Sequence, residues 1–261
     1  MVKRNPKQEG TNLWDCRPQT GKCPLNCNQC FYNRPGAFYV DINKPNIPTP
    51  EEVGDGIVRM NCGHDSNLQR ELVIEIAREY KHVFFNTSIP RFDFPGPVVY
   101  TANPMEEKLA YLLTGDEITP NLMFVRLRVS ASNLKHIKSA VDWYANWCKV
   151  PVVLTFMAYY ERNVLEQVLS NNQLEGWTQY DIENRAYIFK VRHINEYWCP
   201  TVKLKAYVLN KMQEIGGRLV TMCGTLYSDY CRDCRNCEFY YWQTIKFMME
   251  RTTLRNFLRQ F

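Results

Sequence analysis

Short runs of apolar and β-branched residues recur along the chain, separated by stretches with helical spacing. Runs of this length, bounded by turn residues, are typical of buried strands. We expect seven strands, at Leu13–Cys16, Ile57–Cys62, Val83–Thr87, Val98–Ala102, Leu122–Val129, Val152–Phe156 and Arg218–Met222.

Between these strands, apolar residues recur at steps of three and four, which is typical of helices packed on one face. Leu68, Leu72 and Ile76 predict one such helix, and Ser66 and Gln69 form a capping-box pattern at its start. We expect three further helices, over Leu134–Cys148, Leu204–Ile215 and Phe239–Phe261.

The alternation of strands and helices favours an α/β fold with a parallel sheet. Because the units follow one another without a break in composition, we expect a partial (β/α)6-type TIM barrel over residues 1–222 rather than an open sheet. Residues 223–261 form a cysteine-rich, helical C-terminal extension that we expect to belong to the same globular unit.

Composition excludes some classes of protein. The 261 residues are 45% apolar, enough for a full core, so wholesale disorder is excluded. The longest apolar run is far shorter than the roughly 18 residues that a membrane span needs. A net charge of +5 is compatible with a nucleic acid partner but does not single one out.

The eleven cysteines are the most informative feature of the composition. Their number is odd, and the polar start MVKRNPKQEG predicts no secretion signal, so we expect a cytoplasmic protein. In that reducing compartment, clustered cysteines more often bind metal or react than form disulfides.

The first cysteine group is Cys23, Cys27 and Cys30, a C-x3-C-x2-C spacing in the loop after the first predicted strand. Three thiolates so close together can share one soft metal centre. They are one ligand short of a closed structural zinc site, whereas an iron–sulfur cluster held by three cysteines leaves one iron free. The alternative is a four-cysteine zinc site completed by Cys16.

This motif and its position resemble the radical S-adenosylmethionine superfamily, whose members carry it after the first strand of a partial β/α barrel. The resemblance implies an enzyme in which Cys23, Cys27 and Cys30 hold a [4Fe–4S] cluster and S-adenosylmethionine binds the fourth iron. It further implies an electron donor such as flavodoxin or ferredoxin. Reductive cleavage of S-adenosylmethionine would then give a 5′-deoxyadenosyl radical that abstracts a hydrogen atom from the substrate.

The chain departs from the pattern of this family at two places. Many members have an aromatic residue just before the third cysteine, near the adenine, where this chain has Gln29; Phe31 and Tyr32 are the expected substitutes. After the second strand, where the family commonly has a Gly-Gly-Glu element, the chain offers Gly63 and Asp65 for the cofactor.

Residues at the carboxyl ends of barrel strands are further candidates for cofactor binding. Arg128 is a candidate for the cofactor carboxylate, or else forms an ordinary salt bridge, and Met157 lines either the adenine pocket or the core. Small polar residues at other strand ends either bind the cofactor or satisfy local turns; they are Ser88, Thr101, Asn103 and Ser130.

The second cysteine group contains a C-x2-C-x2-C run, which is the ligand spacing of bacterial ferredoxin clusters. Its members are Cys223, Cys231, Cys234 and Cys237. Four local cysteines make a closed site for either a second [4Fe–4S] cluster or zinc. We favour an auxiliary iron–sulfur cluster and keep structural zinc as the alternative.

Two functions therefore follow from the sequence. The first is a radical S-adenosylmethionine enzyme with two clusters and an unidentified substrate, with a nucleoside or nucleic acid slightly favoured by charge and aromatic content. The second is a non-catalytic zinc protein that binds nucleic acid through four-cysteine sites and basic helices. Arg251, Arg255 and Arg259 recur at four-residue steps, as either a solvated helix face or a phosphate-binding surface.

Overall fold

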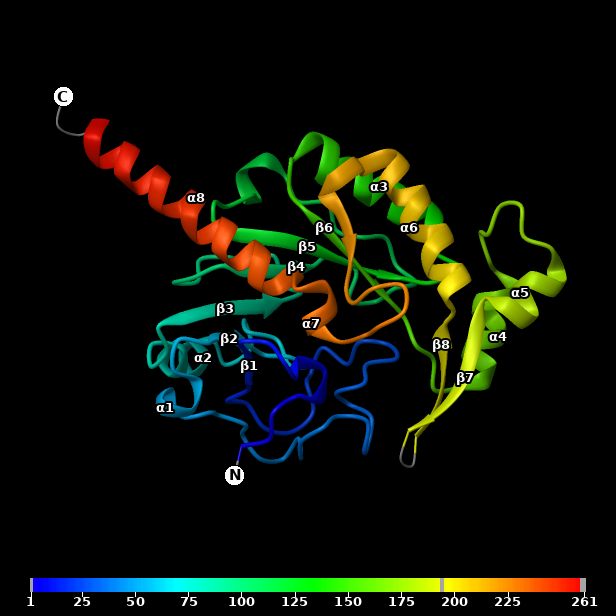
Figure 1. The fold of residues 1–261 in the computed structure, drawn as a ribbon, viewed down its shortest axis with the longest axis horizontal. Coiled ribbons are helices and arrows are strands. Elements are labelled where there is room, and N and C mark those ends of the chain that lie inside the picture. The colour runs from blue at the N-terminus through cyan, green and yellow to red at the C-terminus, as the bar shows by residue number, and fades with distance from the viewer. Residues whose placement is uncertain (1, 193–194, 259–261) are drawn as a thin grey trace.

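A seven-stranded sheet in which every strand pairing is parallel forms the centre of the structure, with strand order β1-β2-β3-β4-β5-β6-β9. The computed structural model describes residues 2–192 and 195–258 (Figure 1). The strands are β1 (Leu13–Cys16), β2 (Ile57–Met60), β3 (His82–Thr87), β4 (Val98–Thr101), β5 (Leu122–Val129), β6 (Val152–Phe156) and β9 (Val220–Met222).

The strands follow one another across the sheet in chain order, and this is consistent with a partial barrel. The predicted α/β fold with parallel strands is therefore confirmed. A separate antiparallel hairpin, β7 (Tyr187–Arg192) and β8 (Asn195–Pro200), was not expected from the sequence.

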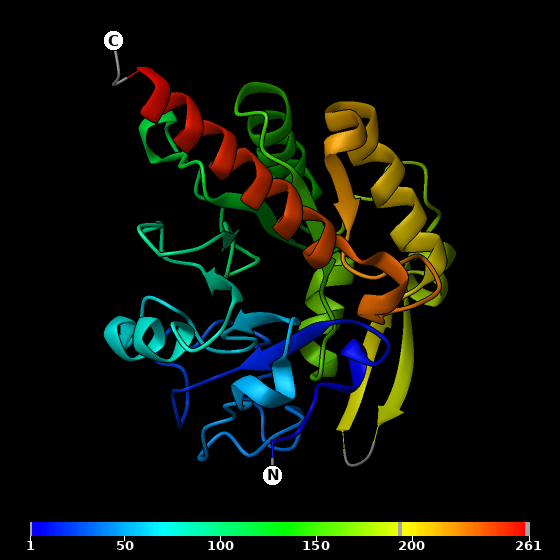
Figure 2. The same cartoon turned by 60° about the vertical axis from the view of Figure 1, so that its left-hand side comes forward.

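Helices cover both faces of the sheet. They are α1 (Pro50–Val53), α2 (Arg70–Ala77), α3 (Leu134–Val141), α4 (Arg162–Ser170), α5 (Gln179–Arg185), α6 (Val202–Gly216), α7 (Cys231–Cys234) and α8 (Asn236–Leu258). The larger hydrophobic cluster joins α2, α3 and α6 to one face. Helix α8 crosses the opposite face (Figures 1 and 2).

The predicted helices are present, with different ends. Helix α3 continues into a π-helical segment, Asp142–Trp147. Helix α6 ends at Gly216 and is followed by Gly217, which has a positive φ of 56°. The predicted last helix begins earlier, at Asn236, and its final residues, Arg259 among them, lie outside the described residues. Among the described helices, none is long and apolar enough to cross a membrane.

The capping box predicted at Ser66 is wrong. Helix α2 begins at Arg70, and Gln69 precedes it in a left-handed conformation without a side-chain cap. The Ser66 hydroxyl instead accepts a hydrogen bond of 3.1 Å from the side chain of Asn61. The buried face of the helix is correspondingly shifted by one residue, to Val73 and Ala77.

Helix α8 is fixed on the inner face of the sheet by aromatic packing and by contacts at its start. Tyr240 and Tyr241 are buried in a cluster with residues near the amino ends of the strands, such as Leu13 and Phe84. The Asn236 side chain donates a 2.7 Å hydrogen bond to the backbone oxygen of Met222 at the end of β9. The inner face is therefore filled by the chain's own C-terminal helix.

This packing predicts a large loss of stability when Tyr241 is truncated. We expect Tyr241→Ala to lower the free energy of unfolding by about 3–5 kcal/mol, because it leaves a cavity between α8 and β3. The control is Phe247→Ala on the same helix, where the side chain is 48% exposed. Chemical denaturation measures both variants, and equal losses would contradict the assigned packing of α8.

Candidate metal centres

Two tight turns give the loop after β1 its shape. The N–H of Asn26 donates to the backbone oxygen of Cys23, and that of Cys30 donates to Cys27, each at 3.2 Å. Asn26 and Gln29 adopt positive φ angles of 42° and 51°, an uncommon conformation for non-glycine residues. The turns bring the three thiols within electrostatic reach of one another.

Arg128, at the end of β5, ties the cysteine loop to the sheet. Its guanidinium donates to the backbone oxygen of Asn28 at 2.7 Å, to the sulfur of Met157 at 3.0 Å and to the backbone oxygen of Pro104. The Asn103 side chain clamps the backbone of Arg128, accepting from its N–H at 2.7 Å and donating to its oxygen at 2.8 Å. Three predicted site residues thus support the loop together.

A polar cavity of about 290 Å³ lies beside Cys27 and Cys30. Its far wall is Tyr160 and Glu161, which follow β6, and the Gln29 side chain accepts a 3.2 Å hydrogen bond from the backbone N–H of Tyr160. The Arg34 guanidinium lies 4.5 Å from the ring centroid of Tyr160.

The sequence analysis missed Arg34, Tyr160 and Glu161. Arg34 lies in the loop after the cysteine motif, and Tyr160 and Glu161 lie beyond the predicted end of their strand, Phe156. The available signal was the position of Tyr160, four residues after that strand end.

Both carboxylate oxygens of Asp65 accept hydrogen bonds from within the protein. One oxygen accepts from the N–H of Asn67 and the hydroxyl of Thr87, and the other accepts from the N–H and hydroxyl of Ser88, all at 2.6–2.9 Å. The side chain is buried and joins the segment after β2 to the end of β3. Asp65 and Ser88 therefore satisfy each other's hydrogen-bonding groups.

The two aromatic residues after the third cysteine differ in exposure. Tyr32 is fully buried, and its hydroxyl accepts from Arg17 at 2.7 Å and donates to the backbone oxygen of Gly21 at 2.9 Å. Gly63 has a φ of 123° and packs so closely on this ring that a Cβ would lie 2.6 Å from it. Phe31 is 42% exposed, so only Phe31 offers a free ring face to a ligand.

The remaining predicted cofactor residues lie at the same edge of the sheet. Thr101 ends β4 opposite Arg126, and Met157 is buried next to Arg128. The backbone N–H of Ser130 donates to the side chain of Asn133 at 3.0 Å, which is a local turn contact. The structure therefore places these residues together at the carboxyl ends of the strands.

The second cysteine group surrounds a small enclosed cavity on the inner face of the sheet. Cys223 follows β9, Cys231 and Cys234 lie on α7, and Cys237 lies in the first turn of α8. The same cavity is lined by strand residues Leu13, Arg59, Arg126 and Val153. The structure thus gathers all four predicted ligands at one place.

Burial governs the protonation of these thiols. It raises the pKa of Cys231 and Cys23 to about 11 and that of Cys237 to about 12. In the metal-free chain these groups are therefore protonated at neutral pH. Because thiolates are the metal ligands, loading either site releases protons.

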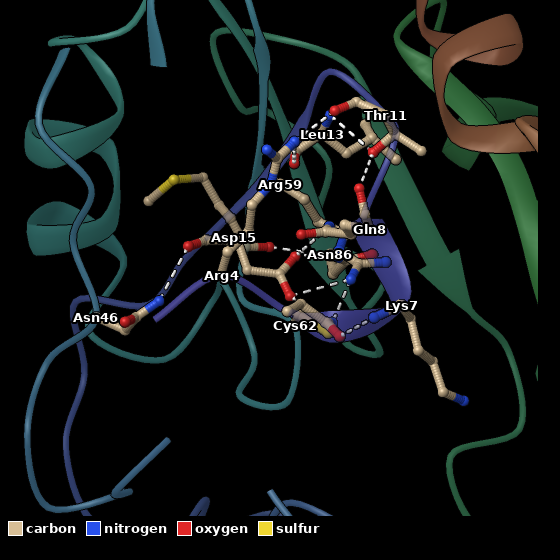
Figure 3. A network of polar contacts seen from close by, with 12 residues as sticks. Arg4, Lys7, Gln8, Thr11, Leu13, Asp15, Asn46, Arg59, Cys62 and Asn86 are labelled. Atoms are coloured by element: carbon tan, nitrogen blue, oxygen red, sulfur yellow. Dashed lines mark hydrogen bonds and ion pairs between the residues drawn. The ribbon is translucent and has the colours of Figure 1, made fainter. Parts of the chain in front are cut away.

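A buried ion pair between Asp15 and Arg59 lies next to the second cavity (Figure 3). The guanidinium donates to the two carboxylate oxygens at 2.7 and 3.2 Å and to the sulfur of Cys62 at 3.0 Å. Asn5 and Gln8 each donate a 2.8 Å hydrogen bond to the same carboxylate. Burial raises the pKa of Asp15, but Arg59 and these hydrogen bonds outweigh it, so the pKa lies below its ordinary value.

Cys16 lies apart from the first cysteine group. Its side chain belongs to the core on the outer face of the sheet, where the hydroxyl of Tyr80 lies 3.7 Å from the sulfur. Burial raises the pKa of this thiol to about 12. This position does not favour the alternative in which Cys16 completes a zinc site with the loop cysteines.

Within residues 2–192 and 195–258, no group of three or more His, Cys, Asp or Glu side chains is arranged so that it could hold a metal ion. No family model, curated protein or solved structure matches the chain.

The ion pair predicts a destabilising effect of Asp15→Asn, which keeps the size of the side chain and leaves Arg59 without a carboxylate. We expect the free energy of unfolding at pH 7 to fall by about 3–5 kcal/mol in urea denaturation of the metal-free protein. The double variant Asp15→Leu, Arg59→Met removes both charges and should lose less. A double variant that loses as much as the single one would contradict the charge argument.

The same pair fixes the sign of the pH dependence. Because the folded pKa of Asp15 lies below the ordinary value of 3.8, its contribution is full above that value and disappears as the pH falls through the lower folded pKa. The stability difference between wild type and Asp15→Asn should therefore shrink from about pH 5 to pH 2.

Proposed function

We propose that the chain is a radical S-adenosylmethionine enzyme with one catalytic and one auxiliary iron–sulfur cluster. The observation that carries the proposal is the position of Cys23, Cys27 and Cys30. These cysteines follow the first strand of a sequentially ordered parallel sheet, and their loop borders a polar cavity. We further propose that the sheet is a (β/α)6-type barrel to which residues 223–261 add the auxiliary site.

The donor set of the first site suits a cluster with one free iron. Two of the three thiols face the cavity, and the other lining residues offer amide, guanidinium, phenol and carboxylate groups but no further sulfur. A closed zinc site needs four ligands, and Cys16 lies on the outer face. When bound, the cluster supplies the electron for reductive cleavage of the sulfonium of S-adenosylmethionine.

The chain's own residues have three tasks in this proposal. Arg128 holds the cysteine loop against the sheet through the backbone oxygen of Asn28. Gln29 fixes the loop to the backbone of Tyr160, whose side chain lines the cavity. Asn26 and Asn28 line the cavity with amide groups that suit the amino and carboxylate ends of the cofactor, whereas the Asn33 amide is paired with the backbone of Cys23.

The decisive experiment is metal analysis of anaerobically purified protein followed by a cleavage assay. We expect roughly seven to eight irons per chain with matching sulfide, and release of 5′-deoxyadenosine after reduction with S-adenosylmethionine. Cys27→Ala should abolish the release because it removes a ligand of the first cluster. The matched control is Cys148→Ala, a partly buried cysteine that follows the π-helical segment and lies outside both groups, which should retain it.

Two outcomes would contradict the proposal. Zinc in both sites without iron would favour the non-catalytic zinc protein. Continued release of 5′-deoxyadenosine by Cys27→Ala would refute the assignment of the loop cysteines.

Tyr160 provides a second test, directed at the cavity. Its aromatic ring is expected to contact the cofactor, and stacking on an adenine contributes about 1–3 kcal/mol. Tyr160→Leu should therefore weaken S-adenosylmethionine binding about tenfold or more at unchanged iron content, as measured by equilibrium dialysis of the oxidised protein. Tyr180→Leu, on the exposed face of α5, is the control. Equal affinities in the two variants would place the cofactor elsewhere.

A further inference from the structure

Arg126 has a positive charge on the inner face of the sheet that no acidic side chain balances. The residue lies on β5 and lines the enclosed cavity together with the four cysteines of the second group. Its guanidinium donates a 3.3 Å hydrogen bond to the side-chain oxygen of Asn86, a neutral amide. In the described part of the chain, no carboxylate forms an ion pair with it.

Arg59 lines the same cavity, but its charge is already balanced. Asp15 holds it at 2.7 Å in the buried ion pair. The third arginine at the cavity, Arg235, is exposed, and its Nε donates to the backbone oxygen of Arg232. Among the strand residues that line the cavity, Arg126 therefore presents the positive charge that no carboxylate of the described residues balances. Arg126 is partly buried, and a partly desolvated cation is stabilised by an anion nearby, so negative charge in the cavity would complement it.

The side chain of Arg126 is held in this orientation by its neighbour. The side-chain nitrogen of Asn86 donates a 3.0 Å hydrogen bond to the backbone oxygen of Met60 on β2. This orients the amide so that its oxygen accepts from Arg126. The guanidinium is therefore oriented by the protein before any metal binds.

We propose that Arg126 is the counter-ion of an anionic metal–thiolate group held by Cys223, Cys231, Cys234 and Cys237. Four thiolates around either a [4Fe–4S]²⁺ core or a zinc ion have a net charge of about −2. Arg126 supplies the compensating charge that Arg59, paired with Asp15, does not. This inference rests on the second metal site of the proposed function and is independent of which metal occupies it.

The test uses the full chain with Cys23, Cys27 and Cys30 replaced by Ala, so that metal can occupy only the second site. In this background Arg126→Gln removes the charge, Arg126→Lys keeps it, and Arg218→Gln removes an equal charge from an exposed position. Metal content is determined first, and loss of the bound metal to a chelator is then followed anaerobically.

We expect Arg126→Gln to lower metal affinity roughly 10- to 100-fold, with Arg126→Lys close to the parent and Arg218→Gln unchanged. If the metal is iron, the midpoint potential of the cluster should also shift to more negative values in Arg126→Gln, because lost positive charge disfavours the reduced form.

The inference would be overturned if Arg126→Gln retained its metal against the chelator as well as the parent does. Arg126→Lys serves here as the control that a variant at this position folds and loads metal. Retention of zinc that depends on Arg126 would support it and would overturn only the auxiliary iron–sulfur cluster. Catalysis by the first site is judged separately, by 5′-deoxyadenosine release from the chain with all its cysteines.

Discussion

The ion pair between Asp15 and Arg59 determines how the inner face of this sheet is organised. Each member comes from one of the first two strands, and the register of β1 and β2 places them directly side by side. The carboxylate also collects Asn5 and Gln8 from the N-terminal segment and the hydroxyl of Tyr39 from the loop that follows the cysteine motif. A single buried charge thus ties together three segments that are far apart in the sequence.

The inner face has two layers of side chains, one near the amino ends of the strands and one towards their carboxyl ends. The ion pair belongs to the second layer. Nearer the amino ends of the strands, apolar residues such as Leu13 and Phe84 pack against Tyr240 and Tyr241 of α8. Towards the carboxyl ends, charged and thiol side chains replace them around the second cavity. Polar groups in such a layer require partners, because an unpaired buried charge costs several kcal/mol. The pairing of Asp15 with Arg59 meets that requirement for two residues, whereas the partly buried Arg126 has, among the described residues, only the neutral amide of Asn86 as a side-chain hydrogen-bond partner.

The strands of the main sheet could be predicted because each is a short, continuous apolar run between turn residues. The prediction failed where the structure depends on exposure and on contacts that the local sequence pattern does not record. The β7–β8 hairpin is half-exposed and interleaved with charges, so it lacks the apolar run of a buried strand; Ile188 and Val191 lie largely in solvent. The start of helix α2 was predicted three residues too early because the hydroxyl of Ser66 bonds to Asn61 across the loop rather than to the helix.

The residues of the candidate sites also fall into those that the sequence could predict and those that it could not. The cysteine groups could be read from spacing because their members are neighbours in the chain. Arg59 and Tyr160 could not, since tertiary folding brings them to the cysteines from strands and loops that are distant in the sequence.

The two cysteine groups differ in the number of thiols and in the cavity beside them. The second group lies between the sheet and the start of α8, and four cysteines and three arginines line its small cavity. The first lies on a loop at the carboxyl edge, beside a polar cavity, with one thiol fewer. A closed set of four ligands suits a structural or electron-transferring centre, whereas three ligands and an adjoining cavity suit a centre that binds a further molecule. Helix α8 packs near the amino ends of the strands, whereas the cysteine loop lies at the opposite, carboxyl edge of the sheet, where Arg128 holds it in place.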